Sequence, residues 1–449
     1  MTGLALDTTS AIEWYRRNRT RSEAIFDLID PSAYYSRPIS LRNPIVFYEG
    51  HLPAFSVIAF LRRGLGRPPV DTRLESLFER GIDPESEASA VPRSGASTSW
   101  PSRDEVRAFA RACDEAIVTA MRSLSNDAIP LEGLYTALEH EAMHQETLLY
   151  MWHRLAYNLK RLPSQEIGRS GDQEKSDHEK SSLLSPEQLN SRKHVPPGTA
   201  TLGVSRGEIP FGWDNEFEAH RVTVDAFDVD AFPVINAQFL EFVNGGGYAQ
   251  RDLWDDEGWE WIQKEKVTHP AFWISRSSSF SWRGMFGEIP LPADWPVYVS
   301  HAEASAYARW KGRRLMTEPE FHRAAYSAPH GSERAHPWGD APPDATRGNF
   351  DFAGFDPTSV AAHPAGASAW GVHDLVGNGW EWTSTVFAPF DGFAPMRSYP
   401  EYSADFFDGR HYVMKGASPA TAKELVRRSF RNWFRGNYPY VYAKFRTAQ

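Results

Sequence analysis

The sequence predicts an α + (α+β) protein, in which a helix bundle is followed by an irregular domain of short helices and strands. Three observations predict this class. The chain has 449 residues, more than one compact core usually holds. Up to about residue 160, apolar side chains recur at three- and four-residue steps, as they do in amphipathic helices. Residues 199–449 instead combine short β-like runs with frequent Gly, Pro and Asn and with most of the 16 tryptophans.

Residues 1–162 are expected to form an antiparallel four-helix bundle. The segments with helical periodicity are 10–29, 46–65, 103–124 and 133–155. Four amphipathic segments joined by connections of this length suit a bundle in which neighbouring helices run antiparallel. Ser102, followed three residues later by Glu105, predicts a capping box at the start of the third segment.

Residues 163–198 differ in composition from the parts on either side. The stretch SQEIGRSGDQEKSDHEKSS is polar, charged and nearly free of large apolar side chains, which predicts a mobile linker or loop. Beyond it, residues 199–449 are expected to form the second domain. Its predicted strands lie at 201–204, 220–224 and 227–232, and a short helix is predicted at 301–312.

The composition argues against several classes of protein. With 48 basic and 58 acidic side chains, the formal charge is −10, whereas a nucleic-acid-binding protein needs a basic surface to meet phosphates. No run of about 18 apolar residues predicts a membrane span, and residues 1–20 lack the pattern of a signal peptide. The single cysteine, Cys113, excludes a disulfide within the chain and an iron–sulfur site made by it. We therefore expect a cytoplasmic protein with neither nucleic acid nor membrane as a partner.

The strongest chemical signal is a pair of histidines in the fourth helical segment. His140 and His144 are four residues apart, so they lie one turn apart on the same face of a helix. Apolar residues share that face, among them Ala137, Leu148 and Met151, so both imidazoles are expected to point inward. Unpaired imidazoles in such a place are costly, and a metal ion would satisfy both.

Two kinds of metal site fit the pair, beside the alternative of two histidines without a metal. His140-Glu141-x-x-His144 has the zinc-peptidase pattern, with Glu141 as general base. The extended form of that pattern needs Gly and His where this chain has Thr147 and Tyr150, which disfavours it. The other kind takes His51, at the start of the second helical segment, as its third ligand. Three imidazoles on one side of an ion leave the opposite positions open for substrate and dioxygen.

His51, together with the H-x-x-x-H-x-E motif that ends at Glu146, resembles the ergothioneine-pathway sulfoxide synthases of the EgtB type. The resemblance spans nearly the whole chain. It implies a DinB-like four-helix bundle joined to a domain similar to formylglycine-generating enzyme, with a C-type-lectin-like fold. The segments 377–383 (GNGWEWT) and 315–321 resemble scaffold motifs of that second domain. True formylglycine-generating enzymes need cysteines there, and Cys113 lies in the helical part, so a role as a substrate wall is implied instead.

The resemblance implies a non-heme iron(II) enzyme that uses dioxygen. It would join a thiol, cysteine or γ-glutamylcysteine, to the imidazole C2 of hercynine (Nα-trimethylhistidine) and oxidise the sulfur to a sulfoxide. Iron would be held by His51, His140 and His144. Alternatives within the family are a selenoneine synthase that uses a selenosugar and a 5-histidylcysteine sulfoxide synthase that uses unmethylated histidine. Outside it stand a zinc peptidase, a zinc-dependent thiol transferase on the bundle and a non-catalytic lectin-like binding protein. The sequence determines neither the donor nor the oligomeric state.

A pocket for the trimethylated substrate is implied near the C-terminus. In the family, an Asn-Trp-Phe sequence lines this pocket, and here it is Asn432, Trp433 and Phe434. Phe47, four residues before His51, matches a position that adds another aromatic wall. The chemistry fits, because an aromatic face attracts a quaternary ammonium and an amide can hold a carboxylate.

The segment from Tyr399 to Tyr402 resembles a family segment with two tyrosines three residues apart. The first is implied to donate a proton during the reaction, and the second to hold substrate through water. Met143 stands where other members carry a Gln that touches the substrate imidazole. The residues that bind the thiol are open, with three candidates: Arg93, Arg103 and Arg107.

Overall fold

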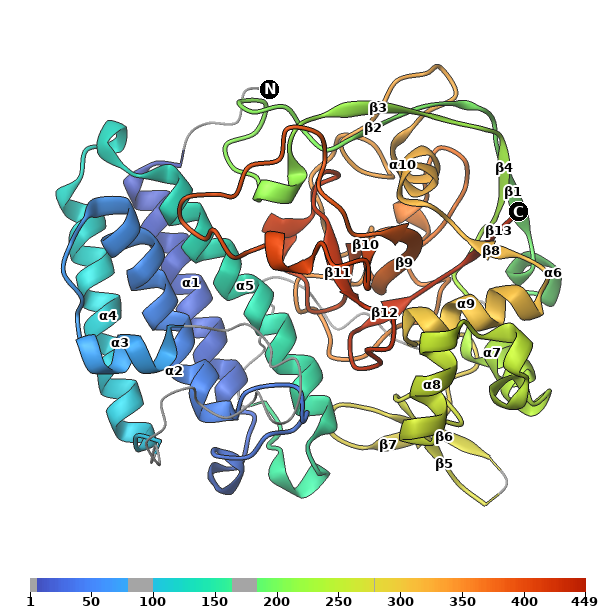
Figure 1. Ribbon diagram of the computed structural model, residues 1–449, viewed down its shortest axis with the longest axis horizontal. Helices are drawn as coiled ribbons and strands as arrows, with labels where there is room; N and C mark the ends of the chain where they lie inside the picture. Colours follow the sequence, from blue (N-terminus) through green and yellow to red (C-terminus); the bar gives the residue numbers. More distant parts are fainter. Residues whose placement is uncertain (1–5, 80–99, 164–183, 278) are drawn as a thin grey trace. The chain divides into compact units, whose positions relative to one another are not determined.

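The computed structural model describes residues 6–79, 100–163, 184–277 and 279–449, and its ribbon is drawn in Figure 1. These residues form two compact units. The first unit comprises the described residues within Met1–Ile167, with Ile209–Phe211 and Pro395–Tyr402. The second comprises the described residues within Gly168–Glu208 and Gly212–Ala394, with Ser403–Gln449. A short piece from near the C-terminus therefore folds with the N-terminal unit.

The first unit is a helix bundle, as the periodicity predicts. Its main helices lie side by side in Figure 1 and are α1 (Thr8–Phe26), α2 (Ile45–Ser56), α4 (Arg103–Ser123) and α5 (Leu131–Arg154), with the short α3 (Thr72–Phe78) beside α2. The single-turn helices η1 (Pro31–Ala33), η3 (Asn126–Ala128) and η4 (Tyr157–Leu159) lie in the connections. The apolar stripes of the main helices face one another and supply the core.

The helix starts follow from local side-chain chemistry. The carboxylate of Asp7 caps α1 by accepting a hydrogen bond from the backbone N–H of Ser10. Ser102 caps α4 in the same way, with its Oγ 3.2 Å from the N–H of Glu105. The predicted capping box is only half present, because the carboxylate of Glu105 forms an ion pair with Arg73 on α3 instead of reaching back to Ser102.

Helix α2 continues directly into η2 (Val57–Gly64), a stretch of π-helix. The change of pattern begins four residues after Pro53, which lacks the N–H that would bond to the carbonyl one turn earlier. Residues 45–64 are apolar enough, by length and composition, to span a membrane, but 94% of their most apolar window is buried inside the protein. The apolar surface of this long helix is therefore used in packing the bundle.

One glycine permits a close helix contact. A Cβ on Gly133 of α5 would lie 2.6 Å from the carbonyl oxygen of Ala59, so no side chain fits between α5 and η2 at that point. The helix that carries His140 and the helix that follows His51 therefore approach each other closely.

The second unit contains two four-stranded sheets, with strand orders β1-β4-β13-β8 and β11-β10-β9-β12. A two-stranded sheet pairs β2 with β3, and a three-stranded sheet has the order β5-β6-β7. All strand pairs are antiparallel except β12 with β9. The strands are β1 (Arg192–Val195), β2 (Gly198–Leu202), β3 (His220–Val224), β4 (Phe227–Asp230), β5 (Trp273–Ser275), β6 (Phe280–Arg283), β7 (Glu288–Pro290), β8 (Arg314–Leu315), β9 (Gly379–Val386), β10 (His411–Ala417), β11 (Asn432–Arg435), β12 (Ala443–Lys444) and β13 (Thr447–Ala448).

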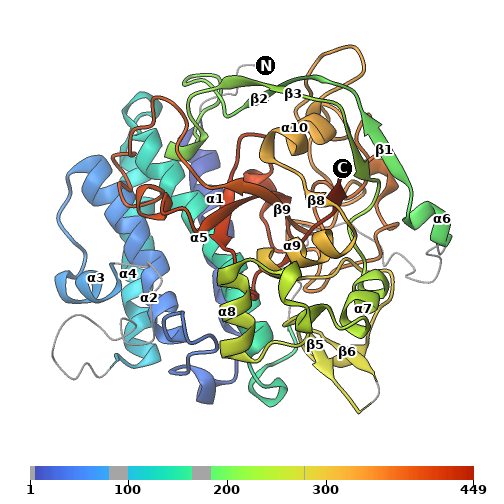
Figure 2. The ribbon, with the colours of Figure 1, turned by 45° about the vertical axis from the view of Figure 1, so that its right-hand side comes forward.

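Short helices complete this unit. They are α6 (Pro186–Leu189), α7 (Asn236–Asn244), α8 (Asp256–Glu265), α9 (His301–Trp310) and α10 (Glu318–Tyr326). Single turns lie in the connections: η5 (Asp214–Glu216), η6 (Gly247–Ala249), η7 (Arg251–Leu253), η8 (Pro364–Gly366), η9 (Ala404–Phe406) and η10 (Lys423–Leu425). The helix predicted at 301–312 is α9. Figure 2 shows α9 and α10 beside β9, the strand that carries the GNGWEWT motif, in agreement with their contacts. In that motif Trp380 and Trp382 are almost completely buried, which fits the packing role given to them.

The linker is predicted at 163–198, and its predicted C-terminal boundary is wrong because regular structure begins before residue 198. Residues 186–189 form α6, and β1 pairs with β4 from Arg192↔Asp230 to Val195↔Phe227. The polar composition of residues 192–195 did not indicate a strand, because Val195 is the one buried residue of β1. Residues 164–183 of the predicted linker lie outside the described part of the chain.

Candidate metal centre

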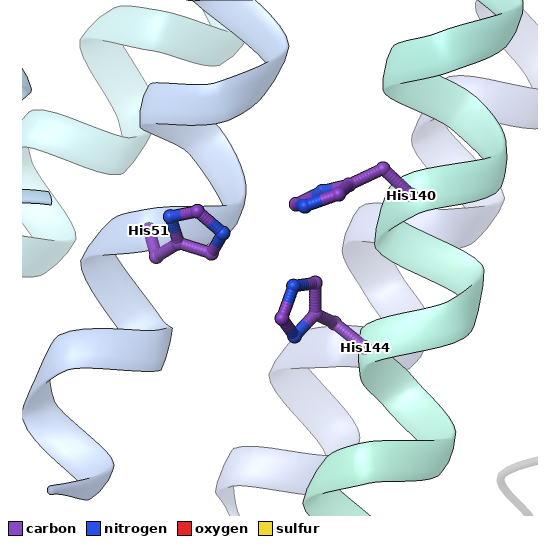
Figure 3. Close-up of side chains that lie close together, drawn as sticks. All are labelled: His51, His140 and His144. Atoms are coloured by element: carbon purple, nitrogen blue, oxygen red, sulfur yellow. The ribbon is translucent and has the colours of Figure 1, made fainter. Parts of the chain in front are cut away.

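Three histidines from two helices of the first unit meet in one place. His51 lies on α2, and His140 and His144 lie one turn apart on α5. Figure 3 shows the ring of His51 opposite the other two rings, in the space between the helices. Each ring offers a nitrogen, and these nitrogens all lie within 4.8 Å of one another. The structure thus brings together the three residues that the sequence suggested as ligands.

The hydrogen bonding of these rings suits metal binding. His51 Nδ1 lies 2.7 Å from the carbonyl oxygen of Phe78, so Nδ1–H donates there and Nε2 keeps its lone pair for another partner. Within the described residues, His51 Nε2, both ring nitrogens of His140 and Nδ1 of His144 are buried without a hydrogen-bond partner. Such groups are costly unless something binds them, and a divalent metal ion fits this set of donors.

The electrostatics favour neutral imidazoles, which is the form that binds metals. Burial lowers the pKa of His51 to about 4. Burial also holds the pKa of His140 well below its ordinary value, and the neighbouring His144 and His51 lower it further. The pKa of His144 is lowered by burial, by His51 and by the cationic Arg42. All three rings are therefore unprotonated at neutral pH and have lone pairs available.

Aromatic rings hold the imidazoles in position. Phe55 is stacked on His140, with ring centroids 3.5 Å apart and an interplanar angle of 13°. Phe47 is stacked on His51 at 5.1 Å and 17°. Because Phe47 is only 4% exposed and also contacts Phe78 and Trp100, its visible role is to brace His51. Its predicted contact with substrate stays a prediction.

The piece Pro395–Tyr402 brings two tyrosines to this cluster. The ring centroid of Tyr399 lies 5.9 Å from that of His140 and 4.9 Å from that of Phe55, edge to face in both cases. Tyr402 OH donates to the sulfur of Met143 at 3.5 Å, and the two tyrosine rings are 5.7 Å apart. Tyr399, Tyr402 and Met143, which the sequence suggested from resemblance alone, are therefore neighbours of the histidines.

Glu141 faces away from the histidines, although it lies between them in the sequence. Its carboxylate accepts hydrogen bonds from Arg19 Nη1 at 2.9 Å and from Ser22 Oγ at 2.6 Å, and both partners belong to α1. One step along a helix turns a side chain by about 100°, which carries residue 141 to the α1 side of α5. The zinc-peptidase interpretation is therefore wrong, because its general base is engaged elsewhere.

Two of the three arginine candidates for thiol binding are engaged in ion pairs. Arg103 and Arg107 both donate to the carboxylate of Glu49, at 3.1 to 3.3 Å, and Arg107 also pairs with Asp27 at 2.8 Å. These ion pairs connect α4 to α2 and to the end of α1, so the guanidinium groups of Arg103 and Arg107 stabilise the bundle. Arg93 lies outside the described residues.

Comparison with known proteins gives the family of the chain. Residues 15–148 match the DinB superfamily, and residues 181–449 match the sulfatase-modifying factor enzyme 1-like domain. A hercynine oxygenase of Mycolicibacterium thermoresistibile is 33% identical over 440 residues, which cover 93% of this chain and 89% of that protein. A second hercynine oxygenase, from Mycobacterium tuberculosis, is 42% identical over 242 residues, 53% of this chain and 55% of that protein. The chain belongs to the same family as these hercynine oxygenases.

One further relative has a name from the same biosynthesis. The ergothioneine biosynthesis protein 1 of Schizosaccharomyces pombe is 28% identical over 438 residues, 92% of this chain and 53% of that protein. The predicted two-part fold, DinB-like and then formylglycine-generating-enzyme-like, is confirmed, and so is the prediction of an oxidoreductase.

The Asn-Trp-Phe sequence forms β11, the edge strand of a sheet in the second unit. Trp433 is stacked on Phe387 at 4.2 Å and 6°, and Phe434 on Tyr438 at 5.2 Å and 17°. Asn432 Oδ1 accepts a hydrogen bond from the N–H of Trp433. Alternation along a strand puts Asn432 and Phe434 on one face and Trp433 on the other. All three are partly exposed, and their role in binding hercynine stays a prediction.

Phe55 and Arg42 are among the residues beside the histidines that sequence reasoning missed. Phe55 could have been found from helical spacing, because it lies one turn after His51 on the same helical segment. Arg42 lies in the irregular segment before α2, is 6% exposed and donates to the hydroxyl of Tyr150 on α5. No periodicity marks such a residue, so only the folded chain reveals it.

Proposed function

We propose that this protein is a non-heme iron(II) oxygenase of ergothioneine biosynthesis. It joins a thiol to the imidazole C2 of hercynine and oxidises the sulfur to a sulfoxide. One observation carries the proposal: three imidazoles, two buried and one partly buried, offer nitrogens within 4.8 Å of one another in a chain that is similar, over 93% of its length, to a hercynine oxygenase.

The proposed reaction balances with one molecule of dioxygen. The imidazole C2–H bond and the thiol S–H bond are lost, and a C–S bond forms between the two substrates. One oxygen atom becomes the sulfoxide oxygen, and the other leaves as water with the two hydrogens. The four electrons that reduce dioxygen come from forming the C–S bond and from oxidising the sulfur, so no further reductant is needed.

The three histidines would hold the iron. Iron(II), when bound, supplies a position for a thiolate and the ability to react with dioxygen. Three imidazole ligands would leave further positions of the ion free for substrates, and the stacked rings of Phe55 and Phe47 keep the rings of His140 and His51 in place. Because all three ligands would be neutral imidazoles and none a carboxylate, the positive charge of iron(II) would not be offset by the protein and would attract a thiolate.

Other side chains have roles around this centre in the proposal. Tyr399, whose ring lies edge to face with that of His140, donates a proton during the reaction. Tyr402 holds the substrate through water, and Met143, whose sulfur accepts a hydrogen bond from Tyr402, stands at the position that faces the hercynine imidazole. Asn432, Trp433 and Phe434 are the residues that the resemblance assigns to the betaine group, whose quaternary ammonium would meet an aromatic face. Holding both substrates in one site makes C–S bond formation effectively unimolecular.

Oxygen consumption tests the proposal directly. The protein loaded with iron(II) is mixed with hercynine or histidine, and with cysteine, γ-glutamylcysteine or a selenosugar as donor. We expect uptake of one dioxygen per coupled product, with hercynine and a thiol, and none when iron is replaced by zinc. A preference for histidine would assign a 5-histidylcysteine sulfoxide synthase, and a preference for the selenosugar a selenoneine synthase. No oxygen uptake with any pair would overturn the proposal.

A further inference from the structure

Ser398, the residue before Tyr399, uses all its polar groups in hydrogen bonds within the first unit. Its backbone N–H donates to Glu132 Oε1 at 2.9 Å, and its Oγ lies 3.0 Å from the same oxygen. Its Oγ is also 2.8 Å from the hydroxyl of Thr136, and its carbonyl accepts from Arg63 Nη1 at 2.8 Å. The residue is 4% exposed; its bond with Thr136 is buried, and its bonds with Glu132 and Arg63 are partly buried.

The partners of Ser398 belong to the two helices that carry the histidines. Glu132 and Thr136 lie one turn apart on α5, and Thr136 lies one turn before His140. Arg63 lies on η2, which continues the helix of His51. Ser398 is therefore attached to both helices, on the same stripe of α5 that presents His140 and His144.

The hydrogen bonds of Ser398 hold a loop that has no helix or strand of its own to make it rigid. Residues 395–402 belong to neither a helix nor a strand, and a side chain on a loop is held less accurately than one on a helix. Tyr399 follows Ser398 directly, and its ring lies edge-on to His140 and Phe55. The place of the phenol thus depends on where residue 398 is held.

We propose that Ser398, together with Glu132 and Thr136, is a positioning residue for Tyr399. The three side chains set the loop so that the phenol reaches the reacting atoms, and they touch neither substrate nor metal themselves. The inference rests on the proposed function, in which Tyr399 donates a proton. A displacement of about 1 Å at such a group can cost about 100-fold in rate.

A double-mutant cycle tests the proposal on the iron-loaded enzyme. Ser398→Ala, Tyr399→Phe and the double variant are compared by kcat, KM, iron content and melting temperature. We expect Ser398→Ala to lower kcat by about 10- to 100-fold with little change in KM and with full iron content. In the Tyr399→Phe background the same change should add nothing, because Ser398 acts through that phenol. Independent losses that multiply would overturn the proposal.

Thr136 supplies a matched pair of controls. Thr136→Val removes the hydroxyl but keeps the shape, and Thr136→Ser keeps the hydroxyl. We expect Thr136→Val to lower kcat and Thr136→Ser to retain it; equal activity of the two contradicts a role for this hydrogen bond. If Tyr399→Phe retains full kcat, the positioning proposal fails while the oxygenase function stands. If the wild-type enzyme takes up no oxygen with any substrate pair, it is the proposed function that fails.

Discussion

The ring of Phe55 lies flat against the ring of His140, with centroids 3.5 Å apart. The two residues come from different helices, so the contact links the helix of His51 to the helix of His140 and His144. An imidazole held in this way loses little freedom when it binds a metal, which favours binding. The accuracy of the metal centre therefore depends on apolar neighbours as well as on the ligands.

Replacing Phe55 should weaken metal binding. Phe55→Leu keeps an apolar side chain but removes the flat surface behind His140, and we expect the iron affinity to fall by about 10-fold, the lower end of the range for residues that support ligands. Phe60→Leu is the matched control, because Phe60 is fully buried on the same continuous helix. Titration of both variants with iron(II) measures the two affinities. Equal iron affinities would contradict the role of Phe55.

Removing a ligand should abolish iron loading. His140→Ala or His144→Ala leaves two imidazoles, too few to hold iron(II) through purification. His153→Ala is the control, since His153 is buried on the same helix but outside the cluster. Iron content measured by atomic absorption should be near zero in the first two variants and unchanged in the third. Full iron content without His140 would exclude it as a ligand.

The metal-free protein should lose stability as the pH falls from about 6.5 towards 4. The pKa of His51 is lowered to about 4 in the folded state, and that of an unfolded histidine is about 6.5, so the unfolded chain binds more protons in this range. His140 and His144 act in the same direction. Urea unfolding at several pH values measures the slope. His140→Leu should have a shallower slope than the wild type, and an identical slope would contradict the assignment.

Glu141 should matter for stability and little for the reaction. Glu141→Gln keeps the volume but removes one of the two carboxylates, those of Glu141 and Asp114, with which the buried guanidinium of Arg19 pairs in the described part of the chain. We expect the free energy of unfolding to fall by about 1–3 kcal/mol, the cost of weakening a buried charged hydrogen bond. The activity of the iron-loaded variant should stay within a few-fold of wild type. A loss of activity with unchanged stability would restore a catalytic role for Glu141.

Trp433 should contribute to binding of the trimethylammonium group. Trp433→Ala removes an aromatic face, and we expect hercynine affinity to weaken by about 0.5–2 kcal/mol through the lost cation–π contact. Imidazole, which lacks the ammonium group, serves as the control ligand and should bind both proteins alike. Calorimetric titration measures both ligands; unchanged hercynine affinity would remove Trp433 from the pocket.

Several features could be predicted from the sequence because they depend on neighbours along the chain. The four-residue spacing of His140 and His144 places them on one face of a helix wherever that helix lies. The periodicity of the four helical segments predicts the bundle for the same reason. The hydrogen bonds of Glu141 with α1, the ion pairs of Arg103 and Arg107, and strand β1 could not be predicted, because their partners are distant in sequence.

The amino-acid order alone was enough to predict the helical periodicity, the inward-facing histidine pair and, through resemblance, the family and its candidate site residues. Three relationships became known from the folded chain: His51 meets that pair, Glu141 is hydrogen-bonded to α1, and Ser398 attaches the Tyr399 loop to both histidine-bearing helices. The physical reason is that local spacing sets which face of a helix a residue occupies. What lies opposite that face depends on how separate segments pack to bury their apolar surface.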